Sequence, residues 1–391
     1  MPQKMTATFL GTSSGGGPTE SRNCSSLILD IVGDGSLWML DCAEGTLRQF
    51  SLQPQEDAKS VLKVNKIFVT HMHCQSVIIC CTQFARFFIY CFAADHVMGL
   101  PSLLRKILGF PDREVVSSQP MINLYGPAGL RAFLRTTLSL THTKTANRYA
   151  VHELLTSKDA HTPCDDEVLH DSEEPGKDVL CGEDGYWRNF AEVRGIGGPV
   201  YACAGPLVHR DPCIGFIIHE SASLHAPRKL AILGDTSSTA QLTPLLSSTP
   251  GRLSLLVHEA TVADIPEDVD SHLAARRPPS FVATRARVSG HSTPIDAGVC
   301  AGKWGARQLV LNHIGSKFPA PSPGSHTGRR VAVIREIERQ ATEAWRSTPC
   351  DVSEEAPASV EGRNAVAAYD FLTVEVPPQP NDQVDRSQVS R

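Results

Sequence analysis

The chain lacks several features that would assign it at once to a functional class. No two of its twelve cysteines have the Cys-x-x-Cys spacing of a structural zinc knuckle. The formal net charge of −5 leaves no overall basic excess, so any contact with nucleic acid must come from local patches. Residues 1–8 contain neither an apolar secretory core nor an Arg- and Ser-rich transit segment. The sequence therefore favours the cytoplasm or the nucleus, where thiols stay reduced, and leaves the mitochondrion open.

Composition and length are those of a soluble globular protein. Apolar residues make up 41% of the 391 residues and charged residues 20%. We expect one folded domain over residues 1–376 and a polar, proline-bearing, disordered tail over residues 377–391. The segment 156–198 is acidic and punctuated by proline and glycine, so we predict a solvated loop there rather than a second metal site. Three residues with metal-binding side chains lie in that segment: His161, Cys164 and His170.

A histidine pair follows a predicted buried strand over residues 64–69. Two histidines spaced i, i+2 on the loop that leaves a strand, as His71 and His73 are, can both turn onto one metal ion. Imidazole and carboxylate are ligands that suit zinc or a similar divalent ion, and Asp95 and His96 follow farther along the chain. A His-x-His pair alone is a weak signal, so the prediction of a metal site depends on these later residues.

The segment 74–93 separates the histidine pair from Asp95 and His96 and differs from its surroundings. It holds four of the twelve cysteines and four of the fourteen phenylalanines, and Arg86 is its one charged residue. Polar residues interrupt an apolar run already short for a membrane span, which needs about 17–25 residues. We interpret the segment as the translation of a retained short intron. The alternative is a natural loop insertion, which loops tolerate at a slowly rising entropic cost.

Later predicted strands also lead into residues that bind metals or move protons. His209 precedes an apolar strand that contains a Gly-aromatic pair, Asp235 ends a strand in Gly-Asp-Thr, and His313 follows an apolar strand. Glu259 lies in a His-Glu-Ala-Thr segment and His291 in a Gly-His-Ser-Thr segment. Because α/β layers place their sites at strand ends, these side chains are candidates for one shared site.

These motifs resemble those of a known family. Without residues 74–93 the chain would read Thr-His-Met-His-Ala-Asp-His, which resembles the His-x-His-x-Asp-His motif of the metallo-β-lactamase superfamily, in the form carried by ribonuclease Z. The segment that starts at Asp41 is similar to the family's Asp-x-Gly-Glu-Gly-Thr, although Ala43 replaces a glycine and Leu47 a glutamine. The His-Glu-Ala-Thr and His-Ser-Thr segments resemble two short motifs of ribonuclease Z. The resemblance covers about residues 5–315.

The resemblance implies an αββα sandwich, with two β-sheets face to face, helices outside and metals at one edge. It implies two zinc ions in each chain, with Mn²⁺ or another divalent ion as an alternative. One zinc would be held by His71, His73 and His209, the other by Asp95, His96 and His313, with Asp235 bridging the two.

The resemblance also implies roles for the residues around the ions. Asp41 would accept a hydrogen bond from an imidazole ligand. Asp95 would orient or deprotonate the nucleophile, while His291, oriented by Glu259, would give a proton to the leaving 3′-oxygen. The implied activity is that of an endoribonuclease that removes the 3′ trailer of precursor tRNA by attack of a metal-activated hydroxide. The shorter forms of this enzyme lead us to expect a homodimer, and no membrane association is expected.

One departure from the family keeps other functions open. Only 25 residues separate His209 from Asp235, enough for a hairpin but not for the long arm with which many ribonucleases Z grip tRNA. The chain could instead be another hydrolase of the superfamily, such as a small-molecule phosphodiesterase or a thioesterase, or an inactive product with a broken metal motif. Four arginines upstream of His291 are candidates for phosphate contacts, or else plain solvated surface: Arg276, Arg277, Arg285 and Arg287.

Overall fold

The computed structural model describes most of the chain. The described residues are 5–15, 17–72, 96–111, 121–165, 167–195, 198–221, 227–275, 278–351 and 362–377. Several predictions concern residues outside these ranges: His73, Asp95, the segment 74–93, Arg276, Arg277 and nearly all of the tail.

The first sheet is built mainly from the N-terminal half of the chain. Its order is β18 (Thr373–Val376), β1 (Met5–Gly11), β3 (Ser26–Asp30), β4 (Leu37–Leu40), β5 (Val64–Phe68), β6 (Ile122–Pro127), β7 (Tyr149–Leu155) and β8 (Glu173–Glu174), and β9 (Asp178–Leu180) also pairs with β7. Strands β4 to β7 run parallel, while β18, β1, β3 and β4 pair antiparallel. The last strand, β18, comes from the C-terminal end of the described chain, so the two ends of the domain meet in one sheet.

The second sheet is built from the C-terminal half. Its order is β10 (Trp187–Gly195), β11 (Gly198–Leu207), β12 (Cys213–Glu220), β13 (Arg228–Ile232), β14 (Arg252–Glu259), β15 (Leu309–Asn312) and β17 (Val366–Ala367). Strands β13, β14 and β15 are parallel, so their carboxyl ends lie at one edge. A short parallel pair, β2 (Ser13–Ser14) with β16 (Ile314–Gly315), joins loops from the two halves.

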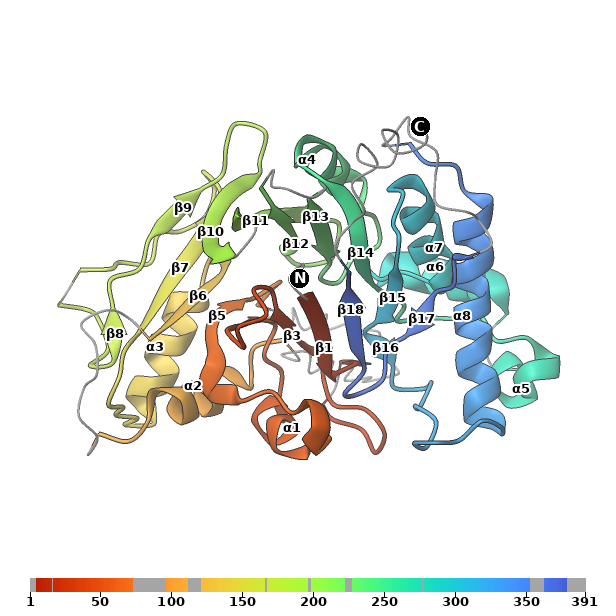
Figure 1. The fold of residues 1–391 in the computed structure, drawn as a ribbon, viewed down its shortest axis with the longest axis horizontal. Helices are drawn as coiled ribbons and strands as arrows, with labels where there is room; N and C mark the ends of the chain where they lie inside the picture. The colour runs from red at the N-terminus through yellow and green to blue at the C-terminus, as the bar shows by residue number, and fades with distance from the viewer. Residues whose placement is uncertain are drawn as a thin grey trace, which may run out of the picture.

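The helices lie outside the two sheets (Figure 1). Three apolar cores fill the spaces between the resulting four layers. The inner core fills the space between the sheets, where the rings of Phe68 and Phe216 lie 5.5 Å apart. The outer face of the first sheet is covered by α1 (Thr46–Leu52), α2 (Leu100–Leu108) and α3 (Leu130–Leu140). The outer face of the second is covered by α4 (Thr243–Ser248), α7 (Pro294–Lys303) and α8 (Arg329–Ser347). The predicted αββα sandwich is therefore confirmed.

Two further helices and three short 3₁₀ turns complete the described chain. They are α5 (Glu267–Ala274), α6 (Pro279–Val288), η1 (Gln55–Asp57), η2 (Val61–Lys63) and η3 (Ala240–Leu242). Helix α6 has only Val282 and Ala286 buried, so most of its surface faces solvent. Within the described ranges, no helix is long and apolar enough to cross a membrane.

The segment 156–198 differs from the prediction of a loop. It contains β8, β9 and all of β10, which pair with β7 and β11. Residues distant in sequence supply hydrogen-bond partners and counter-charges to these strands, which the local composition does not reveal. Arg131 on α3, for example, pairs with Asp178 on β9 at 3.0 Å.

Candidate metal centre

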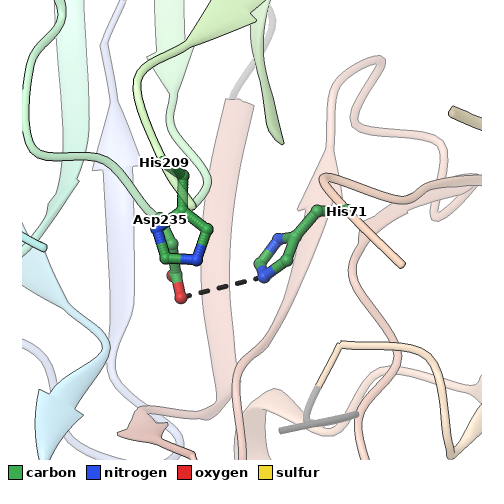
Figure 2. A group of neighbouring side chains, drawn as sticks. All are labelled: His71, His209 and Asp235. Atoms are coloured by element: carbon green, nitrogen blue, oxygen red, sulfur yellow. Dashed lines mark ion pairs between the residues drawn. The ribbon is translucent and has the colours of Figure 1, made fainter. Parts of the chain in front are cut away.

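Five predicted metal ligands converge where the carboxyl ends of strands from both sheets meet. His71 follows β5, His209 follows β11, Asp235 follows β13 and His313 follows β15, while His96 lies just before α2. In Figure 2, His71, His209 and Asp235 point toward one another from separate segments. His73 and Asp95 fall outside the described residues, so their predicted places as ligands stay predictions.

Asp235 is the centre of the arrangement. Its Oδ2 lies 3.8 Å from His71 Nε2, and its Oδ1 lies 3.8 Å from His96 Nε2 and 3.3 Å from His313 Nδ1. Two groups with ligand atoms within 4.8 Å of one another share it: His71, His209 and Asp235 form one, and His96, Asp235 and His313 form the other. A carboxylate with one oxygen toward each group has the arrangement expected of a bridging ligand.

The other ring nitrogen of three of these histidines is already engaged. His71 Nδ1 lies 2.9 Å from Thr70 Oγ1, and His96 Nδ1 lies 2.6 Å from Asp41 Oδ2. His209 Nδ1 lies 2.7 Å from the carbonyl oxygen of Gly290. Metal-binding histidines almost always donate their second N–H to such a partner, which sets the tautomer and the ring orientation. The donor set and its outer contacts therefore fit divalent metal ions such as zinc.

Gly290 is required where it lies. Its φ is +76°, a conformation that side chains rarely adopt, and a Cβ there would lie 2.6 Å from His209 Nδ1. The glycine thus lets the chain present one carbonyl to His209 and then continue directly to His291.

Asp41 is held beside the metal-binding histidines by its own loop. Its φ is +55°, and its Oδ1 accepts the backbone N–H of Thr70 at 2.8 Å. The backbone N–H of Cys42 donates to the carbonyl of His96 at 2.8 Å. The loop therefore contacts both the backbone and the ring of His96, in the place that the sequence predicted for an acceptor of an imidazole N–H.

Glu259 and His291 lie beside Asp235. His291 Nδ1 is 3.2 Å from both carboxylate oxygens of Glu259 and 3.8 Å from Asp235 Oδ2. Burial alone would lower the pKa of His291, but the Glu259 carboxylate raises it to about 9. Burial alone would raise the pKa of Glu259, but His291 keeps it below its usual value. The pair is thus an imidazolium held by a carboxylate, which is the form that can donate a proton.

Asp235 is ionised despite complete burial. Burial alone would raise its pKa, but the surrounding histidines, His313 first, hold it well below the usual value. The site therefore presents a buried negative charge to its histidines, as a metal-binding carboxylate must.

Two threonines of the site were not singled out from the sequence. Thr70 contacts Asp41 and His71, and Thr261 contacts Glu259 and His313. A hydroxyl next to a predicted ligand is the signal that could have found them, but threonines are common at strand ends. Of the four predicted RNA-contacting arginines, Arg285 and Arg287 lie exposed on α6, and the other two fall outside the described ranges.

Comparisons with known proteins identify the family of the chain. No protein-family model matches the chain. Zinc phosphodiesterase ELAC protein 1 of Homo sapiens is 27% identical over 431 residues, covering 95% of this chain and 99% of that protein. Ribonuclease Z of Bacillus velezensis is 30% identical over 337 residues, covering 81% and 89%. The crystal structure of the human tRNase Z short form superposes with a TM-score of 0.58 at 26% identity, covering 95% and 99%. The chain therefore belongs to the ribonuclease Z family of metal-dependent hydrolases with the metallo-β-lactamase fold.

Proposed function

We propose that the chain is a zinc-dependent endoribonuclease that removes the 3′ trailer of precursor tRNA. The observation that carries the proposal is Asp235, shared by two groups of histidines, with the Glu259–His291 pair directly beside it. Relatives named as zinc phosphodiesterase, ribonuclease Z and tRNase Z support the same substrate class.

The described residues supply much of what phosphodiester cleavage needs. One metal ion would be held by His71, His209 and Asp235 and the other by His96, His313 and Asp235, with the predicted His73 and Asp95 completing the set. Bound ions of this kind lower the pKa of water and neutralise charge on the reacting phosphate.

His291 is the proposed proton donor to the leaving 3′-oxygen. Glu259 holds its Nδ1, so the opposite ring edge is the one available to a substrate. The side chain of His291 is 13% exposed, whereas that of Glu259 is 1% exposed, so the histidine is the member of the pair that a substrate can reach. Asp95, from the sequence prediction, is the proposed group that orients the nucleophile.

Helix α6 is the proposed RNA-contacting element next to this donor. It ends three residues before His291, and its exposed surface carries Arg285, Arg287 and Phe281. Guanidinium groups bind phosphate, while an exposed aromatic ring can stack on a base. Strands β12 and β13 pair antiparallel and only seven residues separate them in sequence, too few for a long arm, so α6 gains importance for holding substrate.

A paired cleavage assay tests the proposal. The zinc-loaded protein is incubated with a precursor tRNA that carries a 3′ trailer and, separately, with bis(p-nitrophenyl) phosphate. We expect a cut at the trailer junction, and His291→Ala should slow it by about 10²–10⁴-fold. His326→Ala, a change at an exposed histidine of the loop before α8, is the matched control. Cleavage of the small ester alone would reject the tRNA assignment in favour of a small-molecule phosphodiesterase.

Assembly and location are also proposals. We propose that the protein is a homodimer, because its motifs resemble those of the shorter forms of the enzyme. We also propose that it acts in the cytoplasm or nucleus. Sedimentation at micromolar concentration tests the first, with a single monomeric species as the contrary result. Microscopy of the tagged full chain tests the second, with exclusive mitochondrial signal as the contrary result.

A further inference from the structure

A threonine hydroxyl lies between a buried carboxylate and a metal-binding histidine in each half of the centre. On the first sheet, Thr70 Oγ1 lies 2.9 Å from Asp41 Oδ2 and 2.9 Å from His71 Nδ1. On the second sheet, Thr261 Oγ1 forms a short hydrogen bond to Glu259 Oε2 and lies 2.9 Å from His313 Nδ1.

The same two carboxylates each hold a second histidine directly. Asp41 Oδ2 also lies 2.6 Å from His96 Nδ1, and Glu259 lies 3.2 Å from His291 Nδ1. Each carboxylate therefore serves two imidazoles, one by direct contact and one through a threonine.

Both arrangements lie where two neighbouring parallel strands end, although Thr70 shares its strand end with the histidine and Thr261 shares its strand end with the carboxylate. Asp41 directly follows β4, and Thr70 lies two residues beyond β5, which pairs parallel with β4. Glu259 ends β14, and His313 directly follows β15, which pairs parallel with β14. Neighbouring parallel strands that end together bring a carboxylate, a hydroxyl and an imidazole within hydrogen-bond distance.

The direction of each hydrogen bond follows from the donor inventory. An ionised carboxylate only accepts, so the threonine hydroxyl must donate to it. The hydroxyl oxygen is then left as the acceptor of the imidazole Nδ1–H, and that ring keeps its lone pair on Nε2. For His71 and His96 it is Nε2 that faces Asp235, whereas His313 points its Nδ1 toward both Thr261 Oγ1, at 2.9 Å, and Asp235 Oδ1, at 3.3 Å.

From this order of donors and acceptors we infer that Thr70 is a positioning residue that sets the metal-binding tautomer of His71, and that Thr261 is a positioning residue that orients the ring of His313. The inference concerns the metal site of the proposed function, but it does not depend on RNA being the substrate.

Valine and serine substitutions separate the hydroxyl from the shape of the side chain. Thr70→Val and Thr261→Val keep a branched side chain and remove the hydroxyl, while Thr70→Ser and Thr261→Ser keep the hydroxyl. We expect the valine variants to bind zinc about 10–100-fold more weakly in chelator competition, and the serine variants to stay close to wild type. Thr6→Val is the matched control, because Thr6 is a buried threonine of β1 whose hydroxyl has no hydrogen-bond partner among the described residues.

Two outcomes would overturn the inference. Valine variants that bind zinc as tightly as wild type would show that the hydroxyls do not position the histidines. Serine variants as weak as the valine variants would point to packing instead. Thermal unfolding of each metal-free variant shows whether a loss of affinity merely reflects a loss of fold.

Nitrogen NMR of the histidine rings gives a test that needs no variant to fold. In zinc-loaded wild-type protein, His71 should carry its proton on Nδ1; a proton on Nε2 would reject the inference. Because neither experiment uses RNA, loss of zinc affinity in the valine variants together with an uncleaved precursor tRNA would reject only the proposed function.

Discussion

At the scale of single residues, one carboxylate organises the centre. Asp235 is 2% exposed and lies within 4 Å of ring nitrogens from His71, His96 and His313. His71 and His313 lie just beyond strand ends and His96 lies before α2, and none of the three belongs to an apolar core cluster. A substitution of Asp235 should therefore remove metal binding without unfolding the protein.

Asp235→Ala should abolish zinc binding and phosphodiester cleavage while leaving the fold largely intact. The change removes the shared ligand of both histidine groups. His73→Ala should have the same effect, because His73 is a predicted ligand of the first ion. Zinc content by elemental analysis and circular dichroism of the purified protein check this. Asp351→Ala, at an exposed aspartate, serves as control. Unchanged zinc content in Asp235→Ala would contradict the bridging role.

A buried histidine away from the metal centre makes stability depend on pH. His152 Nδ1 accepts the backbone N–H of Lys177 at 3.0 Å, and its Nε2 lies 3.0 Å from Asn123 Oδ1. These contacts suit the neutral ring, which stacks on Tyr125. Burial, with Lys177 and Arg131 nearby, lowers the pKa of His152 to about 4, against 6.5 for an unperturbed histidine.

The free energy of unfolding should therefore fall as the pH falls from about 6.5 toward 4. In this range the unfolded chain binds a proton at His152 that the folded chain does not, so the contribution is fully present above pH 6.5. His152→Gln should reduce the loss of stability between pH 7 and pH 5 by about 2 kcal/mol, measured by urea unfolding. His326→Gln should leave that loss unchanged. An identical pH dependence in His152→Gln and wild type would refute the prediction.

At the scale of elements, one buried arginine joins a helix to the polar segment that follows β7. Arg131, fully buried on α3, pairs with Glu153 on β7 at 3.4 Å and with Asp178 on β9 at 3.0 Å. It also donates to the carbonyl of Thr162 at 2.6 Å. Glu153 in turn accepts the backbone N–H of Gly129 at the start of α3, where a negative charge is favourable. The arginine thus anchors an acidic segment that would otherwise be solvated.

Arg131→Leu should destabilise the protein by about 3–5 kcal/mol, because it leaves the buried Glu153 without its counter-charge. Hydrogen exchange should accelerate first in β9 and around Thr162, the parts that Arg131 holds. Arg307→Leu, at an exposed arginine, is the matched control. A loss below about 1 kcal/mol, in the range of an exposed ion pair, would show that the cluster adds little.

At the scale of the whole molecule, the metal centre joins the two sheets. Asp41, His71 and His96 come from the half of the chain that builds the first sheet, and His209 and Asp235 from the half that builds the second. The rings of His71 and His96 lie 4.1 Å apart, although the segment 74–93 lies between them in sequence. Any insertion there must therefore leave and return at nearly the same place.

Deleting residues 74–93 should raise the expression and the zinc content of the protein. Closing a flexible loop of that size costs about 2–3 kcal/mol. Its phenylalanines and cysteines are expected to promote aggregation and oxidation beside the site. We predict that the full chain expresses poorly and binds less than two zinc ions. The deletion variant should bind two and cleave precursor tRNA. Equal zinc content and equal cleavage rates for both proteins would identify the segment as a natural loop.

The sequence by itself identified the candidate ligands and several of the strands that position them. Apolar runs predicted the strands before His71, Asp235 and His313, because strand periodicity and the residues at strand ends are local properties of the chain. The two-layer order of the sheets followed from the resemblance of these motifs to a family.

Only the tertiary structure decided which long-range contacts hold the strands of the polar segment and orient the ligand rings. The prediction of a loop was wrong for β8, β9 and β10, because partners distant in sequence hold these strands, as Arg131 does beside Asp178. The positions of Thr70 and Thr261 were equally hidden, since which ring nitrogen carries the proton depends on contacts between neighbouring strands. Local patterns name the residues that can bind a metal, whereas long-range hydrogen bonds determine which atom of each residue faces it.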